Sequence, residues 1–119
     1  MKPLFLCYDR CSTCQKAKKW LEKNGVEVVQ RSITDQRPTV AELQLWVKLS
    51  GLPINKFFNT SGMLYREQNM SEKIKTLPEA ELLKILASNG MMVKRPLVIG
   101  KDFVLLGFKE DKWTSILGK

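Results

Sequence analysis

Two cysteines near the start of the chain are the side chains best suited to chemistry. Cys11 and Cys14 are separated by two residues and stand at the start of a segment with helical periodicity. Three interpretations are open for such a pair: two thiols that exchange electrons through a disulfide, half of a metal site, or two inert core residues. The function of the chain depends on which one holds.

The metal interpretation is weak because the chain has too few ligands. A structural zinc site takes four Cys or His ligands, whereas the 119 residues include three cysteines and no histidine. Zinc would need ligands from a second subunit, so we expect no metal site. Cys7, the third cysteine, lies in an apolar run and is expected to be a small core residue.

The redox interpretation follows from position. Cys11 is expected at a helix N-terminus, where free backbone N–H groups and the helix dipole favour a thiolate. Arg10 and Lys16 add positive potential. Cys14, one helical turn further on, is spaced to attack a disulfide or adduct formed on Cys11. We therefore interpret Cys11 and Cys14 as a redox pair and predict a lowered pKa for the Cys11 thiol.

A helix from about Thr13 to Asn24 must position this pair. Ser12 or Thr13 is expected to cap its first turn and Gly25 to end it. Its buried face is predicted from apolar residues at helical spacing: Cys14, Ala17, Trp20 and Leu21.

Strands are predicted on both sides of this helix, at residues 3–8 and 26–33. Near the end of the chain, residues 95–100 and 103–108 have the pattern of a β-hairpin. A final helix is expected over residues 109–117 with an inward face of Trp113, Ile116 and Leu117.

The segment between these two groups of elements, about residues 38–90, is predicted to be helical. Thr39 and Glu42 have the spacing of a capping box, and Gly51 ends that helix. A short helix is expected in residues 52–58, another capped by Ser71, and a third over residues 79–87 after Pro78.

This order of elements predicts an α/β protein with a thioredoxin-like fold. The helical block would be an insertion between the two halves of a small mixed sheet. We expect residues 1–119 to form a single domain that contains this insertion.

The composition narrows the function classes. The first ten residues lack a secretory pattern and no segment is long and apolar enough to span a bilayer, so we expect a cytoplasmic protein without membrane partners. In that compartment a disulfide is chemical rather than architectural. The net charge of +8 fits an anionic substrate or an acidic protein. Because the basic residues are spread along the chain without an aromatic ladder, we expect no direct nucleic-acid binding.

Four stretches together resemble the arsenate reductase (ArsC) family with its Spx-type relatives: CSTCQKAKKWLEKNGVE, FFNTSGMLYREQN, KRPLVIG and LLGFKEDKW. They occur in the family's order over nearly the whole chain. The resemblance implies a thioredoxin-like fold with a helical insertion. It also implies that Cys11 is the nucleophile that attacks the arsenic atom, that Arg66 and Arg95 bind the oxyanion, and that Pro96 is a cis-proline beside the redox loop.

Ser12 and Thr13 complete the expected substrate site, because backbone N–H groups at a helix start form an anion nest. The sequence departs from the family pattern in two places. Where arsenate reductases usually carry a third arginine, this chain has Phe108, followed by Lys109. The second cysteine, Cys14, is typical of Spx-type relatives rather than of the best-known arsenate reductases.

Two functions follow from the resemblance. The first is a thiol-dependent oxidoreductase without a bound cofactor, recycled by an external donor such as glutathione with glutaredoxin, or thioredoxin. Its partner would be a small oxyanion or a thiol/disulfide protein, and a general disulfide reductase shares this chemistry. The second is an Spx-type regulator whose disulfide controls binding to the RNA polymerase alpha subunit.

Overall fold

The computed structural model describes residues 2–118, and the chain divides into two compact units. The first unit joins the two ends of the chain, Met1–Ser32 and Arg95–Lys119, and the second comprises Ile33–Lys94. The predicted insertion at about residues 38–90 lies within the second unit. That the whole chain forms a single domain stays a prediction.

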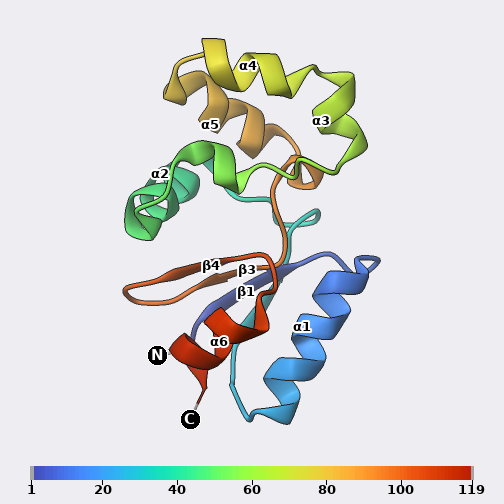
Figure 1. Cartoon of the computed structure of the whole chain (residues 1–119), viewed down its shortest axis with the longest axis vertical. Helices are drawn as coiled ribbons and strands as arrows, with labels where there is room; N and C mark the ends of the chain where they lie inside the picture. Colours follow the sequence, from blue (N-terminus) through green and yellow to red (C-terminus); the bar gives the residue numbers. More distant parts are fainter. Residues whose placement is uncertain (1, 119) are drawn as a thin grey trace. The chain divides into compact units, whose positions relative to one another are not determined.

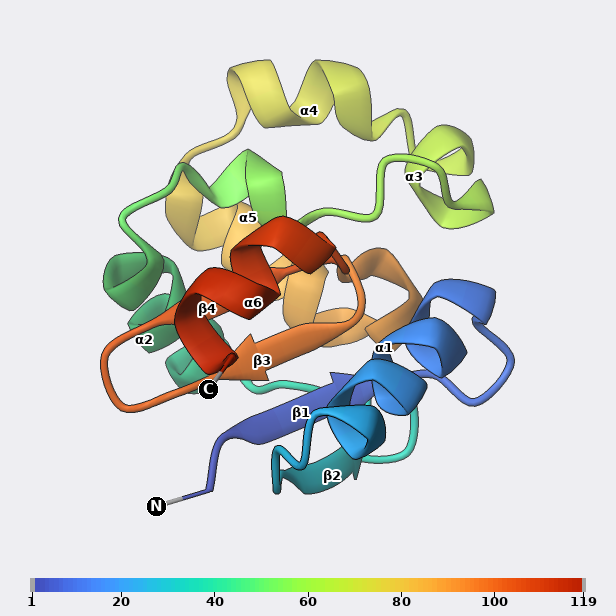
Figure 2. The same cartoon turned by 60° about the horizontal axis from the view of Figure 1, so that its bottom comes forward.

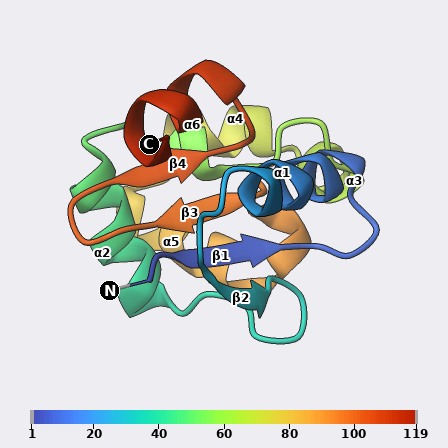
Figure 3. The ribbon, with the colours of Figure 1, turned by 90° about the horizontal axis from the view of Figure 1, so that it is seen from below.

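A four-stranded mixed sheet organises the first unit, with the strand order β2-β1-β3-β4 (Figure 3). The central strand β1 (Leu4–Cys7) pairs in parallel with β2 (Val29–Ser32). On its other side it pairs antiparallel with β3 (Leu97–Ile99), which forms the predicted hairpin with β4 (Val104–Leu106). The mixed α/β architecture predicted from the order of elements is confirmed.

Helices α1 (Ser12–Lys23) and α6 (Glu110–Leu117) cover the same face of this sheet (Figures 1 and 2). The predicted apolar stripe of α1 is buried. It joins side chains of the sheet and of α6 in one hydrophobic cluster, which consists of Phe5, Cys7, Cys14, Ala17, Trp20, Leu21, Val98, Leu105 and Trp113.

Trp113 is the centre of this cluster. Its ring makes edge-to-face contacts with Phe5, Trp20 and Phe108, at centroid distances of 6.4, 5.7 and 4.8 Å. Its Nε1–H donates a hydrogen bond of 3.1 Å to the carbonyl of Gly107. Aromatic pairs of this kind contribute about 0.5–1.5 kcal/mol each beyond the area they bury. These contacts fasten α6 to α1 and β1.

The prediction that Ile116 faces inward is wrong, since 45% of it is exposed. Trp113 and Leu117 are four residues apart and share the inward face of α6. This face is too narrow to include Ile116, which is rotated away toward solvent.

The start of α1 also differs from the expectation. Neither Ser12 nor Thr13 caps the helix: the N-cap residue is Cys11, whose backbone is extended (φ −90°, ψ 120°). At the other end, Gly25 has φ 65° and the Val26 N–H still donates to the carbonyl of Leu21. The strand predicted from residue 26 therefore begins only at Val29.

The second unit is helical, as predicted. It contains α2 (Val40–Ser50), the 3-10 helix η1 (Ile54–Phe57), α3 (Met63–Glu67), α4 (Met70–Thr76), α5 (Glu79–Ser88) and the 3-10 helix η2 (Gly90–Met92). Short helix α3 was not predicted, because its five residues have no apolar periodicity to detect.

Capping decides where helices of this unit begin. The predicted capping box of α2 is confirmed: Thr39 Oγ1 accepts from the Glu42 N–H, and the Thr39 N–H donates to Glu42 Oε1. Gly51 ends this helix in the left-handed conformation. Ser71, however, does not cap α4. The N-cap is Asn69, with φ 52°, because the chain leaves α3 through a left-handed turn that starts α4 two residues earlier.

The Thr39→Ala substitution tests the capping box. We expect it to lower the free energy of unfolding by about 1 kcal/mol, because the Glu42 N–H in the first turn loses its side-chain acceptor. Urea denaturation followed by circular dichroism measures this change. Ser71→Ala is the matched control and should change stability by less than about 0.5 kcal/mol, as expected for an exposed position without special contacts. A larger loss at Ser71 than at Thr39 would contradict this assignment of the caps.

Candidate functional site

Cys11 occupies the turn between β1 and α1. The Cys11 N–H donates a 3.0 Å hydrogen bond to the carbonyl of Tyr8, which closes the turn. Gln15 Nε2 donates to the carbonyl of Asp9 and ties the same loop to the first turns of α1. The Cys11 side chain is half-buried, so its sulfur is held by the protein and still partly open to solvent.

Cys14 belongs to the hydrophobic core, although it follows the half-buried Cys11 by only three positions. Its exposed fraction is 2%, and its sulfur accepts a 3.4 Å hydrogen bond from the backbone N–H of Tyr8. Cys11 and Cys14 are free thiols that come within 3.6 Å of each other. This proximity places the two sulfurs where a small movement could join them.

Arg95 supplies positive charge to the pair from the other end of the chain. Its guanidinium interacts with the Cys11 sulfur and lies over the ring of Tyr8, with Cζ 5.1 Å from the ring centroid. Its Nε and Nη1 atoms are buried, and no acceptor in residues 2–118 pairs with them. The Arg95–Pro96 peptide bond is cis, the isomer that the family resemblance implied.

The two thiols have opposite acidities. Burial opposes ionisation of Cys11, but the backbone N–H and thiol of Cys14 and the Arg95 guanidinium outweigh it and lower the pKa of Cys11. Burial, together with the hydrogen bond and charge of Cys11 and the charge of Cys7, raises the pKa of Cys14 to about 12, despite the N–H of Tyr8. Of the two thiols, Cys11 therefore ionises more readily, whereas Cys14 is protonated at neutral pH.

Cys7 is a core residue, as expected. It is 5% exposed at the end of β1, and burial raises the pKa of its thiol although Gln30 Nε2 donates a 3.4 Å hydrogen bond to its sulfur. Its environment gives no activation comparable with that of Cys11.

The remaining predicted residues are less closely tied to the pair. Ser12 and Thr13 are exposed in the first turn of α1, next to Cys11. Arg66 is exposed on α3 in the second unit, and its role in binding an oxyanion stays a prediction. Phe108, at the position of the family's third arginine, packs against Trp20 and Trp113 and provides no charge.

Sequence reasoning missed Tyr8, which was assigned simply to the first strand. Its backbone bonds to both cysteines and its ring contacts Arg95. The sequence around Tyr8 does not reveal this role, because the contact with Arg95 joins residues that are far apart in the chain.

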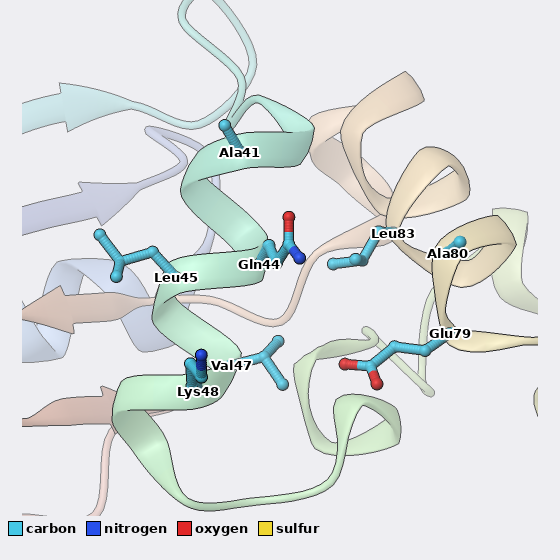
Figure 4. Close-up of a pocket in the computed structure, with 8 residues that line it drawn as sticks. All are labelled: Ala41, Gln44, Leu45, Val47, Lys48, Glu79, Ala80 and Leu83. Atoms are coloured by element: carbon cyan, nitrogen blue, oxygen red, sulfur yellow. The ribbon is translucent and has the colours of Figure 1, made fainter.

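A groove of about 630 Å³ in the second unit contains different chemistry (Figure 4). It lies between α2 and α5, and its polar lining residues are Gln44, Lys48 and Glu79, without a cysteine. Within residues 2–118, no cluster of three or more cysteine or carboxylate side chains could hold a metal ion. None of the helices in that same range has the length and apolarity to cross a membrane.

Known proteins resemble this chain over almost its full length. The ArsC family model matches residues 6–116. The uncharacterized protein YusI of Bacillus subtilis (strain 168) is 49% identical over 113 residues, which cover 95% of this chain and 96% of YusI. The global transcriptional regulator Spx of Staphylococcus aureus (strain Mu50) is 26% identical over 102 residues, which cover 86% of this chain and 76% of Spx.

Solved structures agree with the fold. A protein from Bacteroides fragilis described as related to the ArsC family shares 56% identity, with a TM-score of 0.93 and coverage of 97% of both chains. A possible arsenate reductase from Streptococcus mutans UA159 shares 34% identity, with a TM-score of 0.84 and coverage of 90% of this chain and 91% of that one. The thioredoxin-like fold predicted from the sequence is therefore confirmed.

The opposed thiol acidities predict selective alkylation. With iodoacetamide, Cys11 should react first, with a pH midpoint below that of an ordinary thiol, because its thiolate is stabilised in the folded protein. Cys14 should stay unmodified until the pH approaches its raised pKa. Peptide mass spectrometry after timed reaction at several pH values measures both rates.

The Arg95→Gln variant should move the Cys11 midpoint upward and slow its alkylation at pH 7 roughly three- to tenfold, because a charge-assisted interaction is lost. Arg10→Gln is the matched control, since Arg10 is exposed and adjacent in sequence but is not among the groups that stabilise the Cys11 thiolate. An equal effect of both substitutions would show that general positive charge, rather than Arg95, activates Cys11.

Proposed function

Given that this chain belongs to the ArsC family, we propose that it is a thiol-dependent oxidoreductase in which Cys11 attacks the substrate and Cys14 resolves the adduct. The observation that carries the proposal is the pair itself. One thiol is half-exposed and acidified beside Arg95, and a second, protonated thiol lies within 3.6 Å of it. Neither an inert core pair nor a metal site requires such a difference in acidity.

The first step is nucleophilic attack by the Cys11 thiolate. On an oxyanion such as arsenate, the sulfur forms a bond to arsenic and one oxygen leaves as water after protonation. On a disulfide, the thiolate forms a mixed disulfide and one thiolate leaves. Helix α1 supports this step because its first N–H groups face the incoming negative charge.

The second step uses Cys14. Its thiolate attacks the Cys11 sulfur, the Cys11–Cys14 disulfide forms, and the electron pair of the broken bond leaves with the product. For arsenate the product is arsenite, so two thiols are oxidised as arsenic gains two electrons. Two molecules of glutathione, with glutaredoxin, or one molecule of reduced thioredoxin then supply the two electrons that restore both thiols.

Arg95 is the residue best placed to hold an anionic substrate. Its fork is fixed over the Tyr8 ring beside Cys11, and a planar guanidinium binds oxyanions in a bidentate manner. We propose that the N–H groups of Ser12 and Thr13, in the first turn of α1, contribute to the same site. Phe108 provides no third arginine, so this site carries less positive charge than the family pattern.

The match to Spx supports a second candidate, a redox-switched transcriptional regulator. In that case the Cys11–Cys14 disulfide would control binding to the RNA polymerase alpha subunit. The net charge of +8 would then serve a protein interface.

The decisive experiment asks whether arsenate oxidises the pair. Reduced protein is mixed with arsenate, and the Cys11–Cys14 disulfide is followed by mass spectrometry while arsenite is quantified. We expect one arsenite per disulfide in a single turnover. Cys11→Ser should abolish both signals, and Cys14→Ser should stop at an adduct on Cys11.

Cys7→Ala is the control, because Cys7 is buried and not activated, and it should retain disulfide formation. If arsenate has no effect but glutathione disulfide oxidises the pair, the protein is a disulfide reductase of the same mechanism. If the pair oxidises with neither substrate, the enzyme proposal fails, and binding of the polymerase alpha subunit to the oxidised and reduced forms tests the regulator.

A further inference from the structure

Tyr8 contacts three parts of the candidate site at once. Its backbone carbonyl accepts from the Cys11 N–H at 3.0 Å, and its backbone N–H donates to Cys14 Sγ at 3.4 Å. Its ring lies under the guanidinium of Arg95. A substitution of Tyr8 by another amino acid keeps its backbone N–H and carbonyl, whereas the contact with Arg95 requires an aromatic ring.

The ring contact matters because Arg95 has little else to fix it. Nε and Nη1 of Arg95 are buried without an acceptor in residues 2–118, and no carboxylate within that range forms an ion pair with Arg95. A guanidinium keeps its five donors when an aromatic face holds it, whereas a carboxylate partner would occupy them and neutralise the charge. The Tyr8 ring therefore fixes the position of Arg95 and leaves its Nε and Nη1 donors without a protein acceptor, while the guanidinium also interacts with the Cys11 sulfur.

We propose that Tyr8 is a positioning residue whose aromatic ring holds the Arg95 guanidinium beside Cys11, in an orientation in which the Nε and Nη1 donors are left for an anion. The inference rests on the proposed function, because it adds Tyr8 to the residues of that same site. It does not require a particular substrate. Its essential content is that Tyr8 acts on Cys11 through Arg95.

The test uses the full chain with all three cysteines and needs no substrate. Tyr8→Leu removes the ring, and Tyr8→Phe keeps it without the hydroxyl. We expect Tyr8→Leu to slow iodoacetamide alkylation of Cys11 at pH 7 about threefold, as the loss of a moderate cation–π contact allows, with an upward shift of the pH midpoint. Tyr8→Phe should restore the rate of the unmodified protein to within about twofold, since phenylalanine retains the ring face.

A double-mutant cycle separates positioning from structural damage. In the Arg95→Gln background, Tyr8→Leu should cause no further change in Cys11 alkylation, because the residue through which it acts is gone. Tyr65→Leu is the control for loss of a half-buried tyrosine ring, since Tyr65 contacts Phe58 in the second unit. Circular dichroism and thermal unfolding verify that each variant is folded.

Three results would overturn the proposal. Tyr8→Leu could leave alkylation of Cys11 unchanged, its effect could persist at full size without Arg95, or Tyr8→Phe could fail to restore the rate. If Tyr8→Leu does not fold, the comparison of Tyr8→Phe with Tyr8→Trp replaces it, and both must retain fast alkylation. Arsenate turnover is measured in parallel, so that inactivity of every protein, with the alkylation pattern intact, counts against the proposed function alone.

Discussion

The free N–H groups at the start of α1 are the physical constraint on which the site depends. An α-helix leaves its first N–H groups without partners in the helix, and here the residue at the N-cap is a cysteine rather than a serine or threonine. A thiol caps poorly, but a thiolate is a charged acceptor at a favourable place. The unpaired N–H groups of the helix are satisfied by a negatively charged sulfur, and the same interaction lowers the pKa of Cys11.

The rest of the first unit keeps that helix end in place. β1 leads directly into the Cys11 turn, and the buried face of α1 packs against the sheet and Trp113. Strand β3 pairs antiparallel with β1, with Leu97 opposite Leu6, so Arg95 lies at the end of β1 that leads into the Cys11 turn. Further along α1, Trp20 packs against Phe108 and Trp113, so this aromatic cluster anchors the helix whose first turn carries the two thiols.

Local patterns predicted a large part of this arrangement. The spacing of Cys14, Ala17, Trp20 and Leu21 indicated the buried face of α1, and the hairpin and capping box were equally visible. The predictions of helix caps were wrong where the backbone turn before a helix, rather than the type of residue, determines where the helix begins. Ser12 and Ser71 have the right chemistry for caps, but turns closed by other backbone bonds placed Cys11 and Asn69 there instead. The contact of Tyr8 with Arg95 could not be predicted, because it depends on how strands from both ends of the chain pair.

The mutual influence of the two thiols also bears on the order of the two steps in the proposed reaction. Two causes that raise the pKa of Cys14 come from Cys11: the hydrogen bond between the thiols and the negative charge of Cys11. Once the Cys11 sulfur is bonded to another atom, its charge is gone, and Cys14 loses a proton more readily. Burial stays the largest cause of the raised pKa of Cys14, and the Cys11 thiolate adds to it only as long as its sulfur carries no other bond. In the proposed reaction, the bond that forms on Cys11 would therefore also make its neighbour the stronger acid that the next step uses.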